Sequence, residues 1–167
     1  VDRMNPDYFP ILLMNSVLGG GITGRISMNL REDKGYTYGA NSNFQFRRGP
    51  GPFRAGGDMQ TKYTKESIAE LMKEINGIRG AAPITQKELD YYKQRLIRLY
   101  PGGFETVGGI SGQLSNLVVF GLPDSYFNEY IAKVNAVTLD DVNRVAKKYL
   151  DPSKMAIVIV GDRKVIE

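Results

Sequence analysis

Two side chains that donate hydrogen bonds, Arg31 and Tyr38, lie seven positions apart on either side of Gly35. A guanidinium group carries five N–H donors and a phenol carries one O–H donor, and neither must lose a proton to act. Such a pair is suited to binding the backbone carbonyl groups of a peptide or a developing oxyanion. The sequence leaves an alternative open, in which Arg31 pairs with Glu32 or Asp33 and Tyr38 is an ordinary core aromatic residue.

The composition excludes several classes of enzyme. The 167 residues include no histidine and no cysteine, whereas thiol nucleophiles, Ser-His triads and nearly all zinc sites need a thiolate or an imidazole. We therefore expect no catalytic residue that works within this chain alone and no metal site, so that binding is its predicted role.

Local sequence signals predict the elements that position Arg31 and Tyr38. Asn5-Pro6-Asp7 indicates the start of a buried helix over 8–18, which Gly19-Gly20-Gly21 ends. A second helix is predicted over 23–34, with Gly35 at its C-terminal cap. From Tyr36 the apolar period changes to two, which predicts a strand as far as Arg48. One face of that strand should carry Tyr36, Tyr38, Ala40, Ser42, Phe44 and Phe46.

The rest of the chain predicts a hairpin, several helices and a final strand. Gly49-Pro50-Gly51-Pro52 is a turn signal between the first strand and a second one over 53–61. Helices are expected from Thr64 to before Gly80, from the Thr85-Gln86-Lys87-Glu88 capping box to before Pro101, and over 104–120, 124–135 and 138–150. The β-branched run over 155–160 is typical of a strand buried between two neighbours.

The predicted fold class is α+β, with an antiparallel-rich sheet packed against several helices. A buried final strand needs neighbours that the predicted hairpin alone does not supply. We therefore expect residues 1–167 to form a single domain that is truncated at its N-terminus, with further strands before Val1.

The net charge and the glycine-rich segment both permit other readings. A formal charge of +4 and a pI near 9.2 invite nucleic-acid binding, but the basic residues are dispersed and only Arg47, Arg48 and Arg54 resemble a patch. No apolar run is long enough to span a membrane. The segment 19–25 resembles a phosphate loop, but it follows a helix and lacks the Gly-Lys-Ser/Thr ending, which favours a simple turn between helices.

The segments from Leu18 to Ile26 and from Leu30 to Tyr38 resemble the signature of one zinc peptidase superfamily. That family contains pitrilysin, insulysin and mitochondrial processing peptidase, the inverted-zincin metalloendopeptidases. Its C-terminal halves carry a small-Gly-Gly, Ser-Arg-Leu, Leu-Arg-Glu-x-x-Gly-hydrophobic-x-Tyr pattern. Here Gly24-Arg25-Ile26 replaces Ser-Arg-Leu, and Tyr36 stands where leucine is frequent. The segments 137–142 and 157–162 are also similar, so that the resemblance spans essentially the whole chain.

The resemblance implies that this chain is the substrate-binding C-terminal domain of a zinc metalloendopeptidase that cleaves extended peptides. Zinc would be held by H-x-x-E-H and a distant glutamate on a homologous N-terminal domain or partner subunit, so that this chain alone should be inactive. The family's functional arginine and tyrosine match Arg31 and Tyr38. The expected partners are a peptide and the zinc-binding half, in the periplasm or cytoplasm of a bacterium. The alternative is a catalytically inactive structural or core subunit of the same fold.

Overall fold

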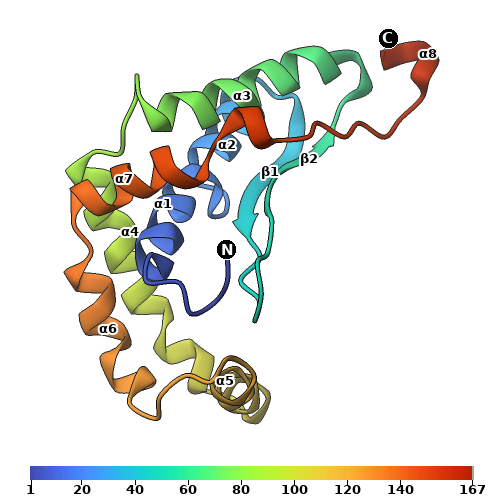
Figure 1. The fold of residues 1–167 in the computed structure, drawn as a ribbon. Coiled ribbons are helices and arrows are strands. Elements are labelled where there is room, and N and C mark those ends of the chain that lie inside the picture. The colour runs from blue at the N-terminus through green and yellow to red at the C-terminus, as the bar shows by residue number, and fades with distance from the viewer. Residues whose placement is uncertain (167) are drawn as a thin grey trace.

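The computed structural model describes residues 1–166 and has an α+β fold, as the sequence predicts (Figure 1). Its main elements are α1 (Tyr8–Gly19), α2 (Arg25–Ser27), the π-helical η1 (Met28–Asp33), β1 (Thr37–Phe44), β2 (Phe53–Met59), α3 (Thr64–Arg79), α4 (Gln86–Leu99), α5 (Val107–Phe120), α6 (Tyr126–Ala136), α7 (Leu139–Tyr149) and α8 (Arg163–Ile166). Short 3-10 turns are η2 (Thr61–Tyr63), η3 (Pro101–Phe104) and η4 (Pro152–Lys154).

The core is built around α1, which contacts β1, α4 and α7. This helix is apolar on nearly every face, and a helix of that composition must be covered on all sides. Ile11, Met14 and Leu18 are fully buried. The end of α1 lies so close to β1 that a Cβ atom added at Gly19 would be 2.4 Å from the backbone nitrogen of Ser42. Only glycine fits at this approach without a shift of the strand.

An ion cluster fixes the start of α1 to α7. Asp7 occupies the N-cap position of α1, but its carboxylate accepts hydrogen bonds from Arg144 Nη2 at 2.8 Å, Lys148 Nζ at 2.9 Å and the Tyr149 hydroxyl at 2.8 Å. The hydrogen bond from Arg144 is the largest influence on the pKa of Asp7, which lies far below its usual range. Asp7 is therefore ionised at neutral pH and joins residues far apart in the sequence.

The hairpin and the helices agree with the sequence predictions to within a few residues at most ends. β1 and β2 pair antiparallel, with Phe44 opposite Phe53. The predicted capping box is present at the start of α4, where Thr85 and Glu88 hydrogen-bond to each other's backbone N–H groups. β1 is shorter than predicted and ends at Phe44. The helix predicted over 23–34 begins at Arg25 and becomes π-helical at Met28.

The final strand predicted over 155–160 is wrong for this structure. The segment is extended but belongs to no strand, and Val158 and Val160 are 83% and 94% exposed. The reason is physical: a strand exists only where a neighbour supplies hydrogen bonds, and the sheet formed by residues 1–166 contains only β1 and β2. The apolar, β-branched side chains of this segment are thus exposed, although their composition predicts a strand that is buried between two neighbours.

Candidate functional site

Arg31 lies in the last turn of the π-helical segment η1, next to a sharp reversal of the chain. Gly35 has a φ of 64°, in the left-handed region that favours glycine. Its N–H donates to the Arg31 carbonyl oxygen at 3.2 Å, and the N–H of Tyr36 donates to the Leu30 carbonyl oxygen at 2.9 Å. These bonds end the helix and direct the chain straight into β1.

Tyr38 lies on the outer side of β1, and the predicted placement on the same face as Ala40 is wrong. The β1–β2 register is irregular between Thr37 and Ala40. Thr37 is buried there: its hydroxyl lies 2.6 Å from the Asp58 carbonyl oxygen and accepts the Gly39 N–H at 3.0 Å. This irregularity shifts the alternation of side chains by one residue. Tyr38 is consequently 90% exposed.

Arg31 and Tyr38 come together at the surface. The Arg31 guanidinium carbon lies 5.2 Å from the centre of the Tyr38 ring, within the range of a cation–π contact. Arg31 Nε also lies 3.4 Å from Glu32 Oε1. The local ion pair considered from sequence therefore exists, but a partly exposed pair at this distance contributes little. The alternative in which Tyr38 is a core aromatic residue is excluded by the exposure of its side chain.

This pair can donate hydrogen bonds to carbonyl oxygens, and the carboxylate beside it, that of Glu32, is paired with Arg31. Zinc needs imidazole, thiolate or carboxylate groups in sets of three or four. The sequence has no histidine or cysteine, and within residues 1–166 no three acidic residues are gathered for a metal. Residues 1–166 therefore do not form a set of ligands that fits a zinc site.

Arg25 and the glycine-rich segment have structural roles. Arg25 Nε and Nη2 each lie 2.8 Å from the Glu88 carboxylate, and its Nη1 and Nη2 also donate to the carbonyl oxygens of Ala82 and Pro83. Arg95 Nη1 donates to the Gly20 carbonyl oxygen at 2.9 Å. The loop thus presents a carbonyl oxygen to a cation, in contrast to a phosphate loop, which presents amides to an anion. This arrangement favours the simple turn expected from the sequence.

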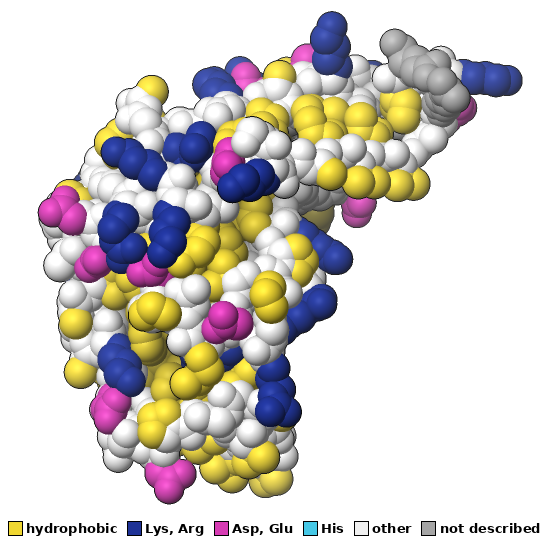
Figure 2. Space-filling view, in the orientation of Figure 1, with side chains coloured by type: hydrophobic (Ala, Val, Ile, Leu, Met, Phe, Trp, Pro, Cys, Tyr) yellow, Lys and Arg dark blue, Asp and Glu magenta, His cyan; other side chains and the backbone are white. Residues whose placement is uncertain are grey.

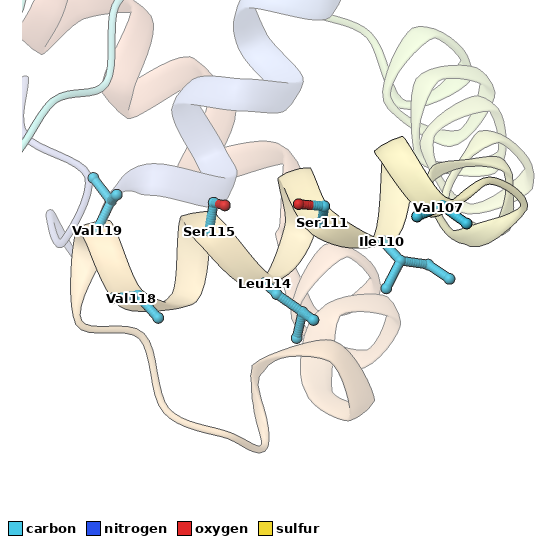
Figure 3. Close-up of a pocket in the computed structure, with 7 residues that line it drawn as sticks. All are labelled: Val107, Ile110, Ser111, Leu114, Ser115, Val118 and Val119. Carbon is cyan, nitrogen blue, oxygen red and sulfur yellow. The ribbon is translucent and has the colours of Figure 1, made fainter.

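A second surface feature lies on α5, at the end of the molecule opposite α3 (Figure 1). Its 14 residues include no charged side chain. A shallow hollow of about 600 Å³ follows the helix, and Figure 3 shows Ile110, Leu114 and Val118 pointing away from the body. It is lined by Val107, Ile110, Ser111, Leu114, Ser115, Val118 and Val119. Apolar side chains also gather at this end in Figure 2. The hollow has no titratable group, so it offers a contact surface and no chemistry.

Sequence reasoning missed two residues that shape the site, Thr37 and Asn29. Thr37 forms the irregularity that exposes Tyr38, and Asn29 precedes Arg31 in η1 and is 7% exposed. A signal existed for Asn29, because an amide side chain on the buried side of a helix requires hydrogen-bond partners. Its partners lie on α3 and could not be identified from local sequence.

Comparison with known proteins identifies relatives of this chain. Residues 1–96 match the family described as the peptidase M16 inactive domain. The chain is 26% identical over 165 residues to the non-peptidase homolog YmxG of Helicobacter pylori, covering 98% of this chain and 38% of that protein. It is 26% identical over 141 residues to the uncharacterized zinc protease YmxG of Bacillus subtilis, covering 84% and 34%.

Two further matches are a mitochondrial protein and a solved structure. The chain is 28% identical over 171 residues to the beta subunit of the mitochondrial-processing peptidase of Dictyostelium discoideum, covering 94% of this chain and 35% of that protein. The crystal structure of a peptidase M16 inactive domain from Pseudomonas fluorescens superimposes with a TM-score of 0.80 at 29% identity, covering 90% of this chain and 36% of that one. The chain thus spans between about a third and two fifths of the length of these curated relatives.

Proposed function

This chain belongs to the family of peptidase M16 inactive domains, and from that membership we propose that it is the substrate-binding C-terminal domain of a zinc-dependent metalloendopeptidase. Its substrate is an extended peptide, and the zinc site is on a homologous N-terminal domain or partner subunit. The observation that supports the proposal best is the contact between Arg31 and Tyr38, which presents two sets of hydrogen-bond donors at the surface.

The proposed role of the pair is to bind carbonyl oxygens of the substrate backbone. The guanidinium N–H groups of Arg31 and the hydroxyl of Tyr38 donate hydrogen bonds that do not depend on the substrate side chains. A peptide held in this way is fixed relative to the catalytic half, and fixed orientation lowers the barrier of a reaction. Zinc chemistry itself belongs to the other half in this proposal, because the sequence has no histidine or cysteine and residues 1–166 gather no three acidic residues for a metal.

β1 offers the extended substrate a backbone edge beside Tyr38. The N–H of Gln45 donates to the Pro52 carbonyl oxygen, so that the backbone groups of alternate residues face away from β2. On that outer edge the Ser42 carbonyl oxygen already accepts a hydrogen bond from Asn15 Nδ2 at 3.0 Å. Because the register is irregular between Thr37 and Ala40, Ala40 is the residue that continues this outer edge before Ser42, and a peptide strand would pair with β1 there.

The test is to assemble this chain with the zinc-binding half, recognised by H-x-x-E-H upstream in the same reading frame or in a neighbouring gene. Hydrolysis of an unfolded peptide is then measured for each half and for the assembly. We expect activity of the assembly only, with a large decrease for Arg31→Ala. Equal activity of the zinc-binding half alone would contradict a role of this chain in substrate binding.

A second function, an inactive structural subunit of the same fold, is favoured by one comparison. The Helicobacter pylori relative is named a non-peptidase homolog. The same experiment separates the two functions, because a structural subunit would assemble stably with its partner and show no hydrolysis with any variant.

The exposed segment 155–160 supports the further proposal that the complete domain contains additional strands beside it. Ile157 and Ile159 are 59% and 48% exposed, and contiguous exposed apolar residues usually mark a contact surface. Hydrogen exchange tests this: amides 156–160 should exchange rapidly in residues 1–167 and become protected in the longer protein. Equal exchange rates in both proteins would contradict the proposal.

A further inference from the structure

Asn29 connects the helix that carries Arg31 to the middle of α3. Its Nδ2 group donates to Glu70 Oε2 at 2.8 Å and to Glu74 Oε1 at 2.7 Å. The two glutamates are four residues apart and so lie one above the other on the same face of α3. The two N–H groups of the Asn29 amide thus donate to two carboxylate groups on one neighbouring helix.

These two hydrogen bonds are of the strong, charge-assisted kind. The hydrogen bond from Asn29 is the largest influence that lowers the pKa of Glu70, with a second contribution from Lys73, whose Nζ lies 3.0 Å away. A carboxylate acceptor makes a hydrogen bond roughly twice as strong as a neutral acceptor does. Asn29 is 7% exposed, so water competes little for the amide.

The backbone of Asn29 begins the turn that determines the direction of Arg31. The N–H of Lys34 donates to the Asn29 carbonyl oxygen at 3.0 Å, a bond between residues five apart that is typical of a π-helix. A π-helical turn contains about one more residue than an α-helical turn. If this turn relaxed to α-helical geometry, the residues after it would rotate by about 100° around the helix axis. Tyr38, which follows the turn, would then move away from Arg31, which lies within it.

We propose that Asn29 is a positioning residue for Arg31. By holding the π-helical turn against α3 through Glu70 and Glu74, it fixes the guanidinium group beside Tyr38. The value of this position for substrate binding rests on the proposed function, but the positioning itself does not. The two claims therefore need separate readouts.

The orientation of the amide supports this assignment. Among residues 1–166 no protein group bonds to Asn29 Oδ1, although that atom is buried. Leaving a buried acceptor without a partner is unfavourable. The reversed amide would place its oxygen against two carboxylates, so the contacts with α3 determine the orientation.

The test measures the position of Arg31 directly, by the NMR chemical shift of its Nε–Hε proton in the intact protein. The Tyr38 ring shifts this signal while Arg31 lies over it, and Tyr38→Leu provides the value without the ring. For Asn29→Ala and Asn29→Asp we expect the signal to move toward the Tyr38→Leu value. Asn76→Ala is the matched control, because Asn76 is an exposed α3 residue that bonds only to the Met72 carbonyl oxygen, and it should leave the signal unchanged.

A reversed pairing separates positioning from simple packing. In the triple variant Asn29→Asp, Glu70→Gln and Glu74→Gln, the carboxylate at 29 accepts hydrogen bonds from the two new amides, and the Arg31 signal should return to its original position. If Asn29→Asp does not fold, Glu70→Ala with Glu74→Ala removes both acceptors at helical positions that tolerate alanine, and the Arg31 signal should move. An unchanged signal in the folded variants would overturn the proposal.

Kinetics of the assembled peptidase add the functional readout. Because misplacing a group that binds substrate weakens binding, Asn29→Asp should raise KM about tenfold with little change in kcat, and the triple variant should restore it. A moved Arg31 signal with unchanged KM would contradict the proposed substrate role while leaving the positioning role supported. An unmoved signal would overturn the positioning role, whatever the kinetics show.

Discussion

The guanidinium carbon of Arg31 lies 5.2 Å from the centre of the Tyr38 ring, although one residue ends a helix and the other begins a strand. Gly35, with its left-handed backbone, reverses the chain between them. The irregular start of β1 then turns Tyr38 outward to meet Arg31. Both donor groups consequently lie close together at the surface of the domain.

Removing either donor should reduce catalysis by the assembled peptidase without unfolding this domain. Tyr38→Phe keeps the ring beside Arg31 and removes only the hydroxyl, so we expect kcat/KM to fall about tenfold, the value of one hydrogen bond. Arg31→Ala removes a charged donor and should lower kcat/KM about 30-fold or more. Thermal unfolding is the control, and Tm should change by less than about 2 °C because both sites are at the surface. A large loss of stability would instead indicate a structural role.

Replacing Asp7 should destabilise the domain and alter its response to acid. Asp7→Asn leaves Arg144 and Lys148 without their shared carboxylate, and we expect the free energy of unfolding to fall by about 2 kcal/mol at pH 7. The folded-state pKa of Asp7 is lowered, chiefly by Arg144. Its stabilisation is therefore fully present above the unfolded pKa near 4 and is lost as the pH falls toward the folded value.

Urea denaturation between pH 7 and pH 3 checks this sign. The stability of the unmodified protein should fall more steeply below pH 4 than that of Asp7→Asn, so that the two curves converge in acid. Parallel curves would show that Asp7 does not contribute through its charge.

Arg25 and Glu88 should behave as a coupled pair in a double-mutant cycle. Arg25 joins the start of α2 to the capping box of α4 through a bidentate contact. We expect the coupling energy from Arg25→Ala, Glu88→Ala and the double variant to be about 1–2 kcal/mol, since partly buried bidentate pairs exceed exposed ones. Additive effects of the two substitutions on the unfolding free energy would contradict a direct contribution of the pair.

Glycine substitutions should have opposite effects in α1 and α5. Gly19→Ala places a methyl group 2.4 Å from the Ser42 backbone nitrogen and should destabilise the domain by about 2 kcal/mol or more. Gly112→Ala is the matched control, because nothing lies within 4 Å of the added methyl group. In the interior of a helix this change should stabilise by about 0.5–1 kcal/mol. Chemical denaturation of both variants measures the difference, and equal effects would refute the close approach of α1 to β1.

The elements predicted correctly are those with signals in the local sequence. Gly35 marks the end of η1, and Thr85 with Glu88 marks the start of α4, because capping depends on residues a few positions apart. The convergence of Arg31 and Tyr38 followed from the short connection between their elements. The fold class followed from the change of apolar period at Tyr36.

The features that escaped prediction depend on contacts between distant residues. The exposed face of Tyr38 arises from the bond of Thr37 to Asp58 on the other strand, and the π-helical turn is tied to Glu70 and Glu74 through Asn29. The segment 155–160 has the composition of a strand, but composition does not show whether a neighbouring strand is present to form hydrogen bonds with it. Each case needs tertiary information that period and propensity do not contain.

The most direct test of substrate binding is the Kd of a fluorescently labelled unfolded peptide for the assembled protein, after a chelator has removed the metal so that no cleavage occurs. We expect Arg31→Ala to raise this Kd about 30-fold, the cost of a lost charged hydrogen bond. Arg98→Ala on α4 is the control and should leave it unchanged. Equal Kd values for the unmodified protein, Arg31→Ala and Arg98→Ala would contradict the central claim that this domain binds the substrate through Arg31.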